Sequence, residues 1–234
     1  MAHVSIGAAA LAIAVVAVPA AAHAGTVAGK IDLPPGGGGA LEKRGRGFLD
    51  RSENPILPVR GFDPLPYMVV VLVPKDGAAP AGAPRQVSWD LIGESFDHPV
   101  LPVVAGTSVI IKNRGRSSPV LRATQDPQLI QPGPINPTGA KELKATGGPL
   151  ITIVDPGSPH LVGRLLVAPS PYFALADGSG RFEIGDVPEG SYTVRVWFRD
   201  DWVKRDEETV AVRGKAEVNP KIPPGFLAPA AATK

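Results

Sequence analysis

The stretch ADGSGRFEIGDVPEGSYTVRVWF, residues 176–198, decides the fold. It begins with a D-G-S-G turn signal, continues through a short strand with Phe182 and Ile184 on one face, and then reaches a V-P-E-G turn signal. The strand that follows is longer, and its apolar side chains again alternate with others. The residues on its apolar face are Tyr192, Val194, Val196 and Phe198. Period-two alternation between tight turns predicts antiparallel strands with one buried face.

The rest of the chain has the same character. Gly and Pro number 27 each among 234 residues, and no apolar pattern with a period of 3.6 residues is sustained. Residues 26–33, TVAGKIDL, predict a first strand, and residues 67–73, YMVVVLV, predict a strand covered on both faces. Residues 206–219, DEETVAVRGKAEVN, predict a hairpin. The expected fold is therefore all-β, built as a β-sandwich.

Residues 1–24 have the composition of a signal peptide. An apolar run is followed by the A-x-A site Ala22-His23-Ala24, which makes Gly25 the expected mature start. An uncleaved membrane anchor is the alternative, although the Ala-rich run is weakly hydrophobic. The sequence therefore predicts an exported protein that is periplasmic, on the cell surface or secreted. Because the chain contains no Cys, it has to fold without disulfides.

Residues 34–66 and the tail 220–234 are rich in Pro, Gly or Ala, and they predict a long loop and an extended end that could serve as docking arms. The loop carries a basic cluster that could contact an acidic partner or a membrane surface, although a solvated loop is the favoured interpretation. Its members are Lys43, Arg44, Arg46 and Arg51. The net charge of the whole chain is only +2, however, so the composition does not favour nucleic acid as a partner.

The motif in residues 176–198 resembles the signature of carboxypeptidase regulatory-like modules, which are Ig-like or transthyretin-like β-sandwiches. Those modules carry an Asp-x-x-Gly-x-Phe strand followed by a Pro-x-Gly-x-Tyr turn and strand. The matching residues are Asp177, Gly180, Phe182, Pro188, Gly190 and Tyr192. This resemblance implies a module over residues 171–219, with residues 25–33 as its first strand.

The middle of the chain resembles exported cupredoxin-like proteins of the plastocyanin-like and methylamine-utilisation-like kind. The similar pieces are FDHPVLPVVAGTSVIIKN and SPHLVGRLLVAPSPYFALAD, at residues 96–113 and 158–177. This resemblance implies a cupredoxin-like β-sandwich over residues 67–170. In the family this domain binds copper and is followed by the same C-terminal module.

The copper ligands of that family are missing. The family places a His about six residues after the Asn that matches Asn113, but Pro119 stands here, and its Cys-x-x-His-x-x-Met pattern falls on Asp155, Ser158 and Leu161. Counting gives the same answer, because a blue-copper centre needs a thiolate and two imidazoles. With no Cys in the chain, a blue-copper centre is excluded, and we expect no cofactor.

Two weaker chemical hypotheses remain for the histidines. His98 and His160 could bind another metal if Asp97 or Asp155 supplied a third ligand. Asp155, Ser158 and His160 are also the residue types of a hydrolase triad, but residues this close on one loop rarely form one. We expect surface histidines without a metal, and a protein that is not an enzyme.

Trp197 and Trp202 could form a binding surface for sugar or protein if both rings were exposed, but for Trp197 we favour packing between two lobes. The leading hypothesis is a non-enzymatic, exported, structural or accessory binding subunit of a cell-envelope assembly. Its partner would be another envelope or secreted protein, and a membrane would be contacted only through an uncleaved signal segment. The alternatives are a carbohydrate-binding module and an atypical metal-binding or redox protein of cupredoxin descent.

Overall fold

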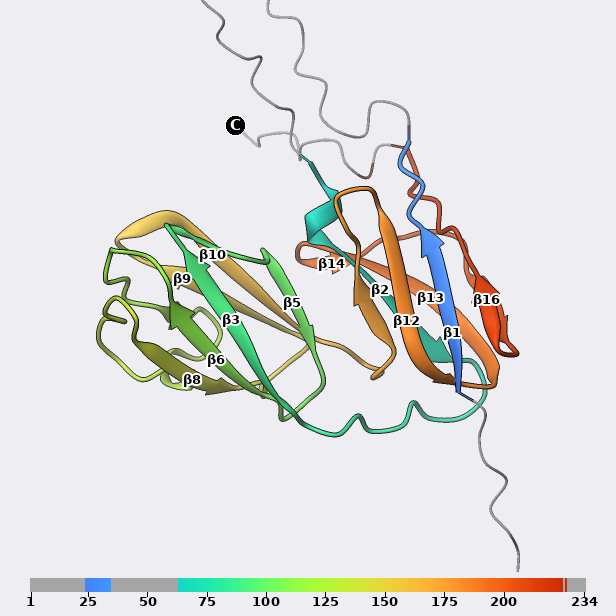
Figure 1. Cartoon of the computed structure of the whole chain (residues 1–234), viewed down its shortest axis with the longest axis horizontal. Coiled ribbons are helices and arrows are strands. Elements are labelled where there is room, and N and C mark those ends of the chain that lie inside the picture. Colours follow the sequence, from blue (N-terminus) through green and yellow to red (C-terminus); the bar gives the residue numbers. More distant parts are fainter. Residues whose placement is uncertain (1–23, 35–62, 225, 227–234) are drawn as a thin grey trace, which may run out of the picture.

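The computed structural model describes residues 24–34, 63–224 and 226, and these residues are almost entirely β-structure (Figure 1). The strands of this part form four sheets, arranged as two lobes. The expected all-β class is confirmed. Residues 1–23 of the expected signal segment, the basic cluster of residues 43–51 and most of the tail lie outside the described residues. No described helix is long and apolar enough to cross a membrane.

The middle lobe consists of two four-stranded sheets in the orders β4-β3-β6-β8 and β5-β10-β9-β7. The strands of the first sheet are β3 (Gln86–Ile92), β4 (Ser95–Phe96), β6 (Ser108–Asn113) and β8 (Ala140–Lys144). Those of the second are β5 (Val100–Val103), β7 (Arg122–Ala123), β9 (Leu150–Asp155) and β10 (Ser158–Val167), and a 3₁₀ turn, η3 (Pro127–Leu129), follows β7. Two of the pairings, β3 with β6 and β5 with β10, are parallel.

The core of the middle lobe is centred on Trp89. This side chain is fully buried, and its ring lies 4.1 Å from that of Phe96, measured between centroids. The indole Nε1 of Trp89 donates a hydrogen bond to the carbonyl oxygen of His98 at 2.8 Å, so burying the ring leaves no polar atom of the indole unsatisfied. Branched aliphatic side chains from both sheets complete this core.

The C-terminal lobe contains a sheet of order β12-β1-β16 and a second of order β11-β2-β13-β14, in which β15 also pairs with β13. The strands of the first sheet are β1 (Ala24–Lys30), β12 (Arg181–Pro188) and β16 (Lys215–Glu217). Those of the second are β2 (Met68–Pro74), β11 (Phe173–Leu175), β13 (Gly190–Phe198), β14 (Asp201–Trp202) and β15 (Glu208–Val212), and the 3₁₀ turn η2 (Leu65–Tyr67) precedes β2. Tyr192, Val194 and Val196 of β13 point into the core between these sheets.

Strand β2 belongs to the C-terminal lobe, which corrects the expected boundary at residue 67. It runs antiparallel to β13, with Met68 opposite Phe198 and Pro74 opposite Tyr192. The division between the lobes therefore falls after Pro74, in the segment 75–85. The prediction that β2 is covered on both faces is confirmed, because Met68–Leu72 are completely buried. A continuous apolar run shows that a strand is buried on both faces, but it does not show which strands lie beside it. The sequence therefore did not indicate the sheet to which β2 belongs.

The two lobes meet at an apolar seam. Its buried members are Val69, Val71, Val100, Leu166 and Trp197, which come from both lobes. At the edge of this seam the Arg164 guanidinium of β10 forms an ion pair with the Asp200 carboxylate, with 2.5 Å between Nε and Oδ1. The lobes are therefore joined by packed side chains and by a charged hydrogen bond in addition to the connecting chain.

The hairpin predicted for residues 206–219 is wrong. Strand β15 pairs with β13, whereas β16 pairs in parallel with β1 in the opposite sheet. The turn at Gly214, with φ +80°, therefore carries the chain across the sandwich instead of back along one sheet. The local sequence has the alternation of a hairpin, but the partner of each half is set by packing with distant strands.

Gly163 allows β10 to pass closely over the Trp89–Phe96 pair. A Cβ at this position would lie 2.5 Å from the Phe96 ring and 2.7 Å from the Trp89 ring. We predict that Gly163→Ala lowers the free energy of unfolding by about 1–3 kcal/mol, because a well-packed core resists added volume. Urea denaturation would measure this change. Gly178→Ala, at a site where an added Cβ meets no atom within 4 Å, is the matched control, and equal losses in both variants would contradict the prediction.

The D-G-S-G turn is held by one carboxylate oxygen. Asp177 Oδ1 accepts hydrogen bonds from the Ser179 hydroxyl at 2.7 Å and from the backbone N–H groups of Ser179 and Arg181, both at 2.8 Å. These bonds stabilise the ionised form, led by the bond from the Ser179 hydroxyl, and they lower the pKa of Asp177 below its ordinary value of 3.8.

A carboxylate with a depressed pKa contributes stability above its unfolded pKa and loses that contribution as the pH falls through its folded pKa. We therefore predict that Asp177→Asn lowers stability at neutral pH and flattens the decline of stability below about pH 3.8. The midpoints of urea unfolding, measured from neutral to acidic pH, would show the difference. Parallel pH profiles for the two proteins would contradict the prediction.

Candidate functional site

The loop between β9 and β10 is closed by its own hydrogen bonds. Asp155, at the end of β9, is 8% exposed, and its Oδ1 accepts a hydrogen bond from the backbone N–H of Gly157 at 2.9 Å. Ser158 starts β10, and Leu161 is buried in the core of the middle lobe. Asp155 thus acts as the polar residue of a tight turn, and Leu161 acts as a core residue.

Asn113 performs a similar task at the end of β6. Its side chain is 1% exposed, and its Nδ2 donates to the carbonyl oxygens of Ser117 and Ile135, both at 2.7 Å. Its Oδ1 accepts from the backbone N–H of Gly115 at 2.8 Å. The carbonyl oxygen of Pro119 in turn accepts from the N–H of Ile135. The amide of Asn113 is therefore used to hold the loop that leads to Pro119.

Each of the two histidines has one carboxylate beside it. His98 Nε2 lies 4.0 Å from Asp97, and His160 Nε2 lies 2.8 Å from Glu94, a residue that sequence reasoning did not single out. Both imidazoles are more than half exposed. Among the described residues no group of three His, Cys, Asp or Glu side chains is placed to hold a metal. Asp155 bonds to Gly157 instead of joining His160 and Ser158 in a triad.

The two tryptophans lie at the seam and do not form a flat platform. Trp197 is only 3% exposed and packs between the lobes, so the condition that both rings be exposed is not met. Trp202 is half-buried, and its ring stands at 88° to that of Trp197, with 5.1 Å between centroids. The Arg195 guanidinium lies over the Trp202 ring, 4.0 Å from its centroid. One face of the more accessible ring is therefore already covered by a cation.

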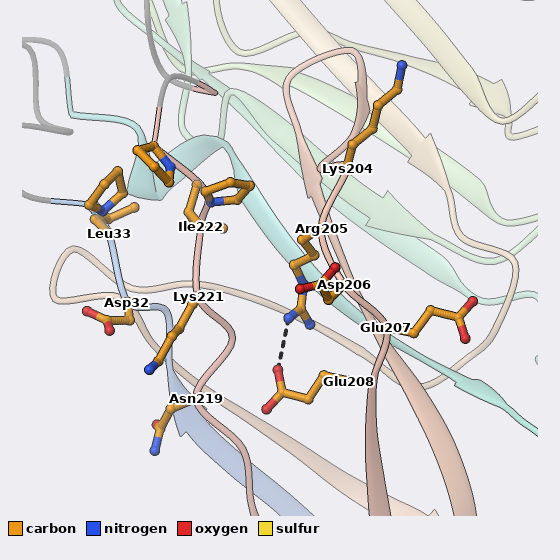
Figure 2. Close-up of a pocket in the computed structure, with 13 residues that line it drawn as sticks. Asp32, Leu33, Lys204, Arg205, Asp206, Glu207, Glu208, Asn219, Lys221 and Ile222 are labelled. Atoms are coloured by element: carbon orange, nitrogen blue, oxygen red, sulfur yellow. Dashed lines mark hydrogen bonds and ion pairs between the residues drawn. The ribbon is translucent and has the colours of Figure 1, made fainter.

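A cleft of about 950 Å³ lies in the C-terminal lobe (Figure 2). Three segments form its walls: residues 32–34, which follow β1, the polar segment 204–208 that leads into β15, and residues 219–224 after β16. Its charged residues are Asp32, Lys204, Arg205, Asp206, Glu207, Glu208 and Lys221. The cleft therefore presents both signs of charge next to apolar side chains such as Leu33 and Ile222.

Arg205 anchors the polar wall of this cleft. Its side chain is 10% exposed; Nη1 donates to Glu208 at 2.9 Å, drawn as a dashed line in Figure 2, and Nη2 donates to the carbonyl oxygen of Val194 at 3.0 Å. Its Nε is buried and has no hydrogen-bond partner in the described part of the chain. The bond to Val194 thus fixes the segment 204–208 onto β13, and the bond to Glu208 braces the segment itself. Lys204 and Lys221 stay exposed on either side of the cleft.

Sequence reasoning missed this cleft. The run RDDWVKRDEE, residues 199–208, contains Trp202, and its density of charge is a visible signal of a polar surface. The meeting of that run with residues 32–34 and 219–224 depends on the parallel pairing of β16 with β1, which the sequence does not indicate. The basic cluster Lys43, Arg44, Arg46 and Arg51 lies outside the described residues, so its relation to the cleft stays a prediction.

No family model and no curated protein matches this sequence. Solved structures of amicyanin variants are similar to part of it. A reduced variant has 16% identity and a TM-score of 0.33, and an oxidised variant has 17% identity and a TM-score of 0.32; each match covers 42% of this chain and 98% of the amicyanin chain. A third variant, described as a reduced Cu(I) form, has 17% identity, the same coverage and a TM-score of 0.33. These values carry no conclusion about copper in this chain.

The side-chain contacts lead to a prediction about metal binding. Because His98 and His160 each pair with one exposed carboxylate, we predict that the protein binds neither Cu(II) nor Zn(II) stoichiometrically. Equilibrium dialysis followed by elemental analysis would measure the bound metal. One equivalent that is retained by the wild-type protein and lost in the variant carrying both His98→Ala and His160→Ala would contradict the prediction.

Proposed function

We propose that this protein is a non-enzymatic, exported binding subunit of a cell-envelope assembly, and that the cleft beside Arg205 is the place where a partner protein docks. In this proposal the middle lobe is a cupredoxin-like shell that has lost its copper ligands. The C-terminal lobe is a carboxypeptidase regulatory-like module. The protein works by holding a partner, without a cofactor and without chemistry of its own.

The observation that carries the proposal is the position of the cleft. Pro34 and Pro224, which line it, are the points beyond which the Pro/Gly-rich segment and the tail continue. The composition of both segments predicts docking arms. Because both segments leave the described structure at the cleft, they could contact the same partner. The cleft also combines apolar side chains with charges of both signs, as the rims of protein interfaces do.

The residues that could have performed chemistry are used in other ways, which also supports a binding role. Asp155 and Asn113 hold their own loops, and His160 pairs with Glu94. A metal-binding or redox role would need a different set of ligands. A carbohydrate-binding role would need aromatic faces that Trp197 and Trp202 do not present together, because their rings are perpendicular.

A site-specific crosslinking experiment tests the proposal. A photo-crosslinking amino acid is placed at Lys204 or Lys221 on the cleft, and at Arg122 in the middle lobe as the control. After irradiation of intact cells, we expect one or two protein partners to be captured in stoichiometric yield from the cleft positions and not from Arg122. The same captured partner should bind Lys221→Glu at least several-fold more weakly, because that variant reverses a charge of the cleft.

The eluate of the tagged protein would also be assayed for sugar and for metal. Equal crosslinking from all three positions would contradict docking at the cleft. A protein-free eluate that carries polysaccharide would favour the carbohydrate-binding alternative, and one that carries stoichiometric metal would favour the redox alternative.

A further inference from the structure

The outer face of the sheet β12-β1-β16 carries an ordered arrangement of charge. Residues of the central strand on this face are small, with Thr26 and Ala28 half-buried, and longer charged side chains from the flanking strands surround them. They border a hollow of about 540 Å³. The charged side chains around it are Lys30, Arg181, Glu183, Lys215 and Glu217. We call this surface the outer face.

The pairing register sorts these charges into rows that run across the strands. Ala28 lies opposite Glu183 of β12 on one side and opposite Glu217 of β16 on the other, so one row carries two carboxylates. Two residues further along β1, Lys30 lies opposite Arg181, so the next row carries two cations. The fifth charge, Lys215, lies opposite Thr26, on the far side of the carboxylate row. Residues directly opposite one another in a sheet point to the same face, and neighbouring strands lie about 4.8 Å apart.

The charges of these two rows do not neutralise one another within the chain. All four charged side chains are exposed, and no ion pair joins them to one another or to another described residue. Glu217 accepts a hydrogen bond from Asn219 Nδ2 at 3.3 Å, and Arg181 helps to lower the pKa of nearby Asp177 without pairing with it. Like charges placed directly opposite one another in a sheet are unfavourable on their own.

We propose that the outer face is the contact between two copies of this chain, packed face to face about a two-fold axis. The axis runs across the strands, between the carboxylate row and the cation row. A rotation of 180° about this axis places each row over the opposite row of the second copy. Glu183 of one copy then faces Arg181 of the other, and Glu217 lies beside Lys30 of the other. Every such contact occurs twice, as a two-fold interface requires.

The charge pattern favours a second copy of this chain over a different protein. The outer face carries both a carboxylate row and a cation row, so two copies of the same face can be complementary in charge. A second axis direction, along the strands, would place carboxylates over carboxylates, so the pattern also selects one orientation of the dimer. Sheets that pack face to face keep their strands nearly aligned, which this axis allows. A three-stranded face is small by comparison with stable interfaces, so the association is weak and falls as the ionic strength rises.

Charge reversal in two complementary variants tests the proposed dimer. The acidic variant carries Lys30→Glu and Arg181→Glu, and the basic variant carries Glu183→Lys and Glu217→Lys. All four positions are exposed, so the fold should tolerate both pairs of changes. In sedimentation equilibrium at low salt we expect the wild-type protein to dimerise and each variant alone to associate at least tenfold more weakly. An equimolar mixture of the two variants should form the heterodimer.

A matched control carries Arg116→Glu and Lys144→Glu, two exposed cations of the middle lobe, and has the same net charge as the acidic variant. It should dimerise like the wild-type protein. Loss of dimerisation in this control would show a general effect of net charge and would overturn the proposal. A wild-type protein that stays monomeric at low salt, or a mixture of variants that does not associate, would overturn it as well.

Discussion

The burial of β2 on both faces is the constraint on which the rest of the structure depends. Met68, Val70 and Leu72 point into the core of the C-terminal lobe, while Val69 and Val71 point into the seam. Because side chains alternate along a strand, a shift of one residue in the pairing with β13 would exchange these two sets. One strand therefore determines both the core of its own lobe and the surface on which the middle lobe packs. Trp197, on β13 next to it, extends that surface.

The loops of the middle lobe are held by ordinary packing and hydrogen bonding. The loop after β6 and the loop between β9 and β10 are each held by a buried polar side chain, Asn113 in the first and Asp155 in the second. Buried polar atoms that are fully hydrogen-bonded fix a single loop conformation at low cost, and the same atoms left unpaired would cost about 1–3 kcal/mol each. The Trp89–Phe96 pair under Gly163 supplies the packing beneath them.

Sequence patterns predicted the strands better than their partners. The alternation of Tyr192, Val194 and Val196 identified the buried face of β13, because alternation is a local consequence of one-sided burial. The placement of β2 and the separation of β15 from β16 could not be predicted, because they depend on which distant strand each one meets. The absence of a thiolate ligand was evident from composition alone. The cleft beside Arg205 was not, since its three walls converge only after β16 has paired with β1.

The edges and faces of the C-terminal lobe also indicate how such a protein can contact others. The chain after β16 contains Pro223 and Pro224, which lack backbone N–H groups and cannot donate to an added strand. In both proposed contacts the recognition would come from side chains, namely the charged groups of the cleft and of the outer face. Because the protein has no disulfides, its stability depends on the apolar side chains buried in the cores and the seam. Contacts made through charged surfaces would leave those apolar side chains buried.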